Sequence, residues 1–404
     1  MPAGLQIGAL GYGARARVDA CGAVQAGELA LDWWVGADDR WHVPAEETTR
    51  QQRRSSAPIV ETMVRIPSGD AVHRVYAVAA DGRAVTVIEI ENRSPAPFTA
   101  ALVVGVTRDA RIEVDGTALR LDGEVVLALP RPPGAWAAAP STREIVMSGG
   151  ARTDGFETQR GPIEVALLFP VSHRTTWRAA LTNAPVDVRA LPDADSVGRG
   201  WDVQLDRGLQ AALPPPIGAG VDAARADLLL APATPEVVAA LEDWGLDAEA
   251  ADGWARLGWN GRRRARRRRG IHEAWAATVA TDARAEPARF LGNLRAVLVN
   301  ESRGRVDLLP GFPPDWLGQS LTVDAVPLRA GSISFAVRWH GSRPALLWDA
   351  PAGVELRAPA LDPAWSSTVA VGEALLAEPP KPLLAMGVRD RSAGTPMSAP
   401  GQFS

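Results

Sequence analysis

Cysteine, lysine and long apolar runs are scarce in this 404-residue sequence. The single cysteine, Cys21, has no partner for an internal disulfide, and a lone thiol is typical of a reducing compartment. The first residues lack a basic segment that leads into an apolar one, and no apolar stretch reaches about 18 residues. We therefore expect a cytoplasmic protein with neither an export signal nor a membrane span.

The sequence also lacks the residue patterns that indicate a metal site or a cofactor-binding site. The five histidines are scattered along the chain, and no pair has the spacing of metal ligands. Gly8, Gly11 and Gly13 neither follow a strand nor clearly lead into a helix, so they do not predict a nucleotide-binding loop. The sequence predicts no metal site and no cofactor.

Charge is nearly balanced, with a net charge of −4 and 43 basic residues that are almost all arginine. This balance gives no basic field that would favour nucleic acid or an anionic membrane as a partner. The run Arg262–Arg269 is the strongest charge feature. It is typical of a solvated helix face or a linker, and the alternative is a docking segment for an acidic protein partner.

Strand signals dominate the first half of the chain. Between Ala71 and about Pro130, short alternating runs are separated by turns at Asp81-Gly82, Asp115-Gly116 and Asp122-Gly123. Asp-Gly supplies the positive φ that tight hairpins need. Similar runs continue past residue 163, and this spacing predicts a large antiparallel sandwich.

Helix signals follow a proline- and alanine-rich stretch at residues 212–219 that interrupts the strand pattern. Thr234 can cap a helix with Pro235 at its first position, and Gly245 can end it. Three more helices are expected, at Asp247–Leu257, Ile271–Ala280 and Pro287–Val299.

Strand signals return after residue 301 and include a hairpin turn at His340–Arg343. The expected fold is mainly β with a short helical insert: a large N-terminal antiparallel β-sandwich, three or four helices and a smaller C-terminal β-sandwich. The expected domains are residues 1–225, a helical segment at 226–300, a β-domain at 301–380 and a mobile tail at 381–404.

The segment Arg305–Asp349 resembles the closing β-domain of six-hairpin glycosidases. The matching residues are Leu308, Leu309, Pro310, Pro313, Trp316, Gly331, Phe335, Val337 and Trp339. The order of the chain, with a β-rich region, then helices, then this β-domain, is also similar to that superfamily. The resemblance implies a glycoside hydrolase relative.

The catalytic helical barrel of that family cannot fit in this chain. Twelve helices with their loops need roughly 180 residues, whereas the interval from Thr234 to Val299 has room for three or four helices. In the family the general acid and its partner carboxylate lie on the barrel, so the resemblance assigns no catalytic residue here.

Tryptophans and acids are interleaved between residues 31 and 47. Indole faces stack on sugar rings and carboxylates accept hydrogen bonds from hydroxyls. The candidate substrate-binding residues are Trp33, Trp34, Asp38, Asp39, Trp41 and His42. Alternatively, the tryptophans fill the core of the sandwich and the acids lie on an exposed loop.

Two pairs of acids are candidates for catalysis. Glu46 and Glu47 are adjacent, so on an extended chain they point to opposite faces. Glu89 and Glu91 share one face of a predicted strand, and we expect that face to meet solvent.

These observations favour a non-catalytic or degenerate relative of six-hairpin glycosidases with a carbohydrate-binding or accessory role. An active glycoside hydrolase that uses Glu46 and Glu47 is the first alternative. The second alternative is a structural or interaction protein that docks through Arg262–Arg269.

Overall fold

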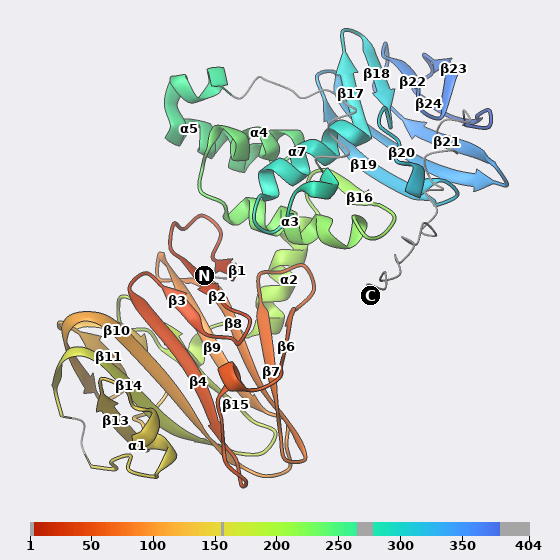
Figure 1. The fold of residues 1–404 in the computed structure, drawn as a ribbon. Coiled ribbons are helices and arrows are strands. Elements are labelled where there is room, and N and C mark those ends of the chain that lie inside the picture. The colour runs from red at the N-terminus through yellow and green to blue at the C-terminus, as the bar shows by residue number, and fades with distance from the viewer. Residues whose placement is uncertain (1–3, 155–156, 265–277, 380–404) are drawn as a thin grey trace, which may run out of the picture. The chain divides into compact units, whose positions relative to one another are not determined.

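The computed structural model describes residues 4–154, 157–264 and 278–379 (Figure 1). Strands make up 45% of the structure and helices 21%, which confirms the mainly β fold class. The predicted tail at residues 381–404 and most of the predicted helix at Ile271–Ala280 lie outside the described residues. So do residues 265–269 of the arginine run, and docking through that run stays a prediction.

The chain forms two compact units. Unit 1 comprises Met1–Asp206 and Asp222–Pro232, and unit 2 comprises Arg207–Val221 and Ala233–Ser404. The predicted domain boundaries at residues 225 and 300 stay predictions.

Unit 1 is the predicted large sandwich, built from fifteen strands. One half holds β1 (Leu5–Gly8), β2 (Arg15–Val18), β3 (Val24–Ala26), β4 (Leu29–Gly36), β5 (Trp41–His42), β10 (Phe98–Asp115), β13 (Ala135–Ala139) and β14 (Gln159–Val171). The other holds β6 (Thr49–Arg53), β7 (Val60–Ile66), β8 (Gly69–Ala80), β9 (Arg83–Asn92), β11 (Ala118–Leu121), β12 (Glu124–Ala128) and β15 (Thr176–Leu181). The long strand β10 links the halves, because it pairs with β4 and β14 and then, past an irregularity between Val106 and Ala110, with β11.

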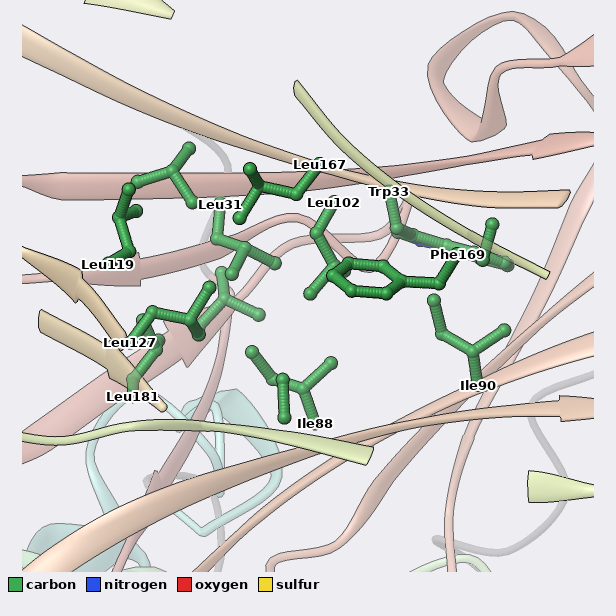
Figure 2. Packing of buried hydrophobic residues seen from close by; sticks show 14 of the residues in the cluster. Leu31, Trp33, Ile88, Ile90, Leu102, Leu119, Leu127, Leu167, Phe169 and Leu181 are labelled. Carbon is green, nitrogen blue, oxygen red and sulfur yellow. The ribbon is translucent and has the colours of Figure 1, made fainter. Parts of the chain in front are cut away.

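The two halves enclose one hydrophobic core, because alternate residues of each strand point inward (Figure 2). Leu31 and Trp33 of β4 pack in the same cluster as Ile88 and Ile90 of β9 and Phe169 of β14. Full burial of one such side chain contributes about 1.5–3 kcal/mol to stability.

The tight turns of unit 1 form as the dipeptides predict. Asp81 and Gly82 have φ values of 48° and 74° and connect β8 to β9. Asp122 and Gly123, at 53° and 88°, connect β11 to β12. Gly116 follows β10 with a φ of 58°. These turns confirm the predicted hairpins.

Two of the helices that the sequence does not predict are long: α2 (Ala194–Leu205) and α3 (Gly218–Leu230). Each contains two glycines, which lower helix propensity. Tertiary packing overrides the low helix propensity of both segments. The two helices bury side chains in one cluster with Tyr76 of β8, namely Trp201 of α2 and Ala226 and Leu230 of α3. The N-cap of α2 is Asp193, whose carboxylate accepts a hydrogen bond from Ser196 N at 2.8 Å.

Short helices complete unit 1. They are η1 (Pro44–Glu46), α1 (Arg143–Met147) and η2 (Val188–Ala190).

Three helices of unit 2 begin at the predicted residues: α4 (Pro235–Asp243), α5 (Asp247–Arg264) and α7 (Pro287–Leu298). However, α5 runs past its predicted end at Leu257, and α7 ends one residue before Val299. Thr234 Oγ1 accepts a hydrogen bond from Val237 N at 3.2 Å, and Gly245 leaves α4 with a φ of 70°. Gly258 interrupts α5 with a φ of 65°, where the sequence predicts a helix end.

Thr234→Ala is expected to lower the free energy of unfolding by about 1 kcal/mol, because Val237 N then loses its partner at the start of α4. Urea denaturation followed by circular dichroism measures the change. Thr368→Ala is the matched control, since Thr368 is exposed and caps no helix. An equal effect of both substitutions would contradict the capping role.

Unit 2 contains two small sheets, as the predicted C-terminal β region requires. One is formed by β16 (Gln210–Ala212), β19 (Leu321–Leu328), β20 (Gly331–His340), β21 (Arg343–Asp349) and β24 (Val371–Leu375). The other is formed by β17 (Val299–Ser302), β18 (Arg305–Leu308), β22 (Glu355–Ala358) and β23 (Asp362–Ser367). The predicted hairpin joins β20 to β21, where His340 pairs with Arg343 around Gly341 at a φ of 62°.

The residues that resemble the six-hairpin family form part of the core of unit 2. Leu308, Leu309 and Trp316 are buried, the last in η3 (Pro314–Trp316). Phe312 meets the Trp316 ring edge-on at 6.1 Å, and Trp339 Nε1 donates to Gln319 O at 3.0 Å. The motif therefore stabilises this unit and presents no reactive group.

Candidate functional site

The tryptophan-rich segment runs through β4, β5 and η1 of unit 1. Trp33 points into the sandwich core, is 0% exposed and stacks on His73 with ring centroids 4.8 Å apart. Its Nε1 donates to Cys21 O at 3.1 Å. Trp34 lies on the opposite face of β4, is 5% exposed and donates from Nε1 to Asp32 at 3.1 Å. Both rings are buried, Trp33 between the halves of the sandwich and Trp34 in a second cluster on the other face of β4, so neither offers a face to a sugar.

Trp41 differs from these two because its ring is only half-buried. It packs against the hydrophobic cluster that contains Trp34, on the outer face of β4. A Cβ atom at Gly36 would lie 3.0 Å from the Trp41 ring, so the glycine makes room for the indole. Trp41 is therefore the indole of this segment that keeps exposed surface.

His42 orders the loop around Trp41. The imidazole is 3% exposed, with Nε2 3.0 Å from Asp39 Oδ1 and Nδ1 3.2 Å from Glu47 Oε1. Arg40 Nη1 donates to the same Glu47 oxygen at 2.5 Å. The structure therefore brings Asp39, Trp41, His42 and Glu47 together, with Asp38 exposed in the connecting turn.

The two runner-up catalytic residues are engaged in ion pairs. Glu46 accepts a hydrogen bond from Arg143, which lowers the pKa of its carboxyl group. The hydrogen bond from Arg40 likewise lowers the pKa of Glu47. A glycosidase general acid needs the opposite shift, a raised pKa. The electrostatics of this loop therefore do not favour proton donation to a glycosidic oxygen.

Asp32 is the carboxyl group of this face whose pKa is raised. Burial is the main cause, although hydrogen bonds from Trp33 N at 2.8 Å and Trp34 Nε1 at 3.1 Å oppose it. Both carboxylate oxygens accept these bonds, and Glu164 of β14 adds a repulsive charge. Asp32 therefore serves to hold the two buried tryptophans.

A second polar cluster crosses the other half of the sandwich. Its members are direct cross-strand neighbours from β6 to β15 and form a charge ladder: Gln52, Glu61, Arg74, Glu89 and Arg178. Arg74 Nε donates to Glu61 at 2.5 Å, and Arg178 Nε donates to Glu89 at 2.8 Å. Burial alone would lower the pKa of Arg74, but its hydrogen bonds to Glu61 and Glu91 outweigh burial and raise it.

The expectation that Glu89 meets solvent is wrong, because its side chain is 2% exposed. Glu89 Oε1 also accepts a hydrogen bond from Tyr76 at 2.7 Å, and the Tyr76 hydroxyl lies 3.0 Å from Pro192 O. The chain that follows β15 therefore covers this face of the sheet. Glu91, two residues further on, keeps partial exposure and pairs with Arg74 and Arg93.

A hollow of about 470 Å³ opens beside the Arg178 end of the ladder. The residues that line it come from β15, η2 and the segment after β12: Pro130, Arg131, Thr176, Trp177, Arg178, Val188 and Arg189. Sequence reasoning missed this site. The three arginines are far apart in the chain, and arginine is too common here to mark them.

The described ranges contain neither a membrane-spanning helix nor a cluster of metal ligands. None of the helices there has the length and apolar character needed to span a membrane. Nor do those ranges contain a group of three or more His, Cys, Asp or Glu side chains that could hold a metal ion.

The structure thus defines a mainly β protein of two units, with a loop that leaves Trp41 partly exposed and an arginine-lined hollow in unit 1. No protein-family model and no curated protein matches the chain. Among solved structures, a bacterial glucoamylase complexed with acarbose shares 7% identity at a TM-score of 0.44, over 61% of this chain and 48% of that one.

A glycosyl hydrolase of family GH92 shares 11% identity at a TM-score of 0.41, over 78% of this chain and 57% of its own. A family GH92 alpha-mannosidase from Bacteroides thetaiotaomicron shares 10% identity at a TM-score of 0.20, over 57% and 32%. The chain spans about half the length of the first two structures. Likeness of this extent carries no information about activity.

Proposed function

We propose that the protein is a non-catalytic, glycoside-hydrolase-like protein that binds carbohydrate in the cytoplasm, in a recognition or accessory role. The observation that carries the proposal is the partly exposed Trp41 in a loop ordered by His42. The resemblance of Arg305–Asp349 to six-hairpin glycosidases supports the same class of ligand.

The loop has the chemistry that sugar recognition requires. An indole face covers the apolar face of a pyranose ring, and nearby carboxylates accept hydrogen bonds from its hydroxyls. Asp38 and Asp39 are exposed next to Trp41. Because the bonds of His42 to Asp39 and Glu47 already order the loop, a ligand has little conformational entropy to remove on binding.

The same bonds argue for binding without hydrolysis. Glycoside hydrolysis uses two carboxyl groups about 5–10 Å apart, one of which must carry a proton near neutral pH. Around Trp41 the carboxylates of Glu46 and Glu47 are held ionised by Arg143 and Arg40. We therefore assign these acids to loop structure.

Trp41→Ala is expected to weaken carbohydrate binding by at least about tenfold, because the stacking surface is removed. A glycan array identifies the sugar, and isothermal titration calorimetry measures the affinity. Trp365→Ala is the matched control, since Trp365 is a half-buried tryptophan of unit 2 and should leave the affinity unchanged.

Two results would overturn the proposal. One is a folded protein that binds no sugar at millimolar concentration. The other is hydrolysis of aryl glycosides that disappears in the Glu46→Gln, Glu47→Gln double variant, which would establish the hydrolase alternative instead.

A further inference from the structure

We propose that the arginine-lined hollow of unit 1 binds a tetrahedral oxyanion, such as the phosphate or sulfate group of a small molecule. The inference is independent of the carbohydrate loop, because no residue that lines the hollow belongs to the Trp41 loop. It depends on how Arg131, Arg178 and Arg189 use their hydrogen-bond donors.

Arg178 is held in place before any ligand arrives. Its Nε donates to Glu89 Oε1 at 2.8 Å, and its Nη1 donates to Leu191 O at 3.3 Å. Glu89 in turn is fixed by Tyr76 and Arg74. The Nη2 group of Arg178 has no partner in the described ranges, so it remains available to a ligand. A guanidinium fixed in this way loses little entropy when it binds an anion.

Arg131 and Arg189 carry positive charges that no carboxylate neutralises. Arg131 Nη2 donates to Pro170 O at 2.9 Å, and Arg189 Nη2 donates to Pro130 O at 3.0 Å. Neither side chain forms an ion pair within the described part of the chain. Backbone carbonyls orient the guanidinium groups and leave most of their five N–H donors unused.

The acids near the hollow are already engaged. Asp187 uses its side chain to accept the backbone N–H of Arg189 at 3.0 Å, which caps η2. Glu91, which pairs in register with Thr176, forms ion pairs with Arg74 and Arg93. Glu89 balances the charge of Arg178, so the net positive charge of the lining comes from Arg131 and Arg189, and this charge favours an anionic ligand.

The number of arginines favours a tetrahedral oxyanion over a carboxylate. A carboxylate presents two oxygens and is satisfied by one guanidinium fork, whereas a phosphate or sulfate group presents oxygens in several directions. Three guanidinium groups line this site together with Trp177 and Val188. A hollow of about 470 Å³ exceeds the size of the ion alone, so it leaves space for the molecule that carries the group.

The test measures binding of inorganic phosphate, sulfate and acetate by isothermal titration calorimetry at constant ionic strength, with the full chain. Phosphate or sulfate should bind more tightly than acetate. The Arg131→Gln, Arg189→Gln double variant should weaken phosphate binding by about 100-fold, because two charge-assisted contacts are lost. Both side chains are exposed, so the variant keeps its core, and circular dichroism checks its fold.

The Arg17→Gln, Arg303→Gln double variant is the charge-matched control, since both are exposed arginines that do not line the hollow. Its phosphate affinity should equal that of the unaltered protein. An unchanged affinity in the double variant, an equal loss in the control, or no phosphate binding by the folded protein would each overturn the proposal. Acetate that binds as tightly as phosphate would overturn the preference for a tetrahedral anion.

Discussion

Arg74→Met is expected to lower the free energy of unfolding by about 3–5 kcal/mol, because it leaves the buried carboxylate of Glu61 without its charged partner, while Glu89 keeps Arg178. Arg74 sits in the middle of the charge ladder, with Glu61 on one side and Glu89 on the other. Both glutamates are buried in the sandwich. Urea denaturation measures the loss as a lower midpoint with an unchanged m value.

Arg108→Met is the matched control for this prediction. Arg108 also bridges two carboxylates, those of Glu28 and Asp122, but all three side chains are exposed. Solvent screens exposed pairs, so this change should leave stability nearly unaltered. Equal effects at Arg74 and Arg108 would show that the buried ladder contributes nothing beyond an ordinary surface pair.

Acidification is expected to destabilise the protein through His73. Burial lowers the pKa of His73 to about 3, and neither ring nitrogen has a hydrogen-bond partner among the described residues. Below the ordinary histidine pKa of about 6.5, His73 becomes protonated in the unfolded chain but stays neutral in the folded chain. The part of the unfolding free energy that depends on neutral His73 is therefore fully present above about pH 6.5. It falls as the pH approaches 3, by at most about 5 kcal/mol.

His73→Phe should remove this part of the pH dependence. The ring can still stack on Trp33, and it brings no nitrogen into the apolar core. The measurement is the difference in unfolding free energy between pH 7 and pH 4 for both proteins, since carboxylates contribute equally to each. His340→Phe, at an exposed histidine, should keep the original pH dependence. A His73→Phe protein with that same dependence would show that His73 does not carry it.

The three tryptophans of the candidate sugar site differ in burial. The sequence treats Trp33, Trp34 and Trp41 alike, because all three stand among acids on a strand-forming segment. The sheet then places Trp33 in the core between the halves of the sandwich, and Trp34 under a second cluster on the other face. Trp41 alone of the three keeps exposed surface, since its ring lies over Gly36 at the end of β4.

The local geometry of the chain follows from the sequence alone. Turns at Asp81-Gly82 and Asp122-Gly123, and the helix start at Thr234, depend on φ preferences and on capping bonds within four residues. The alternation of apolar residues likewise indicated the strands, because side chains alternate along any extended chain. These features need no distant partner.

The tertiary structure decided which faces are covered and which distant residues meet. Glu89 is buried because the chain after β15 folds over a sheet face that alternation alone would leave in solvent. Arg131, Arg178 and Arg189 line one hollow because β15, η2 and the segment after β12 lie together in the sandwich. Burial and convergence depend on long-range packing, so no local pattern in the sequence could indicate them.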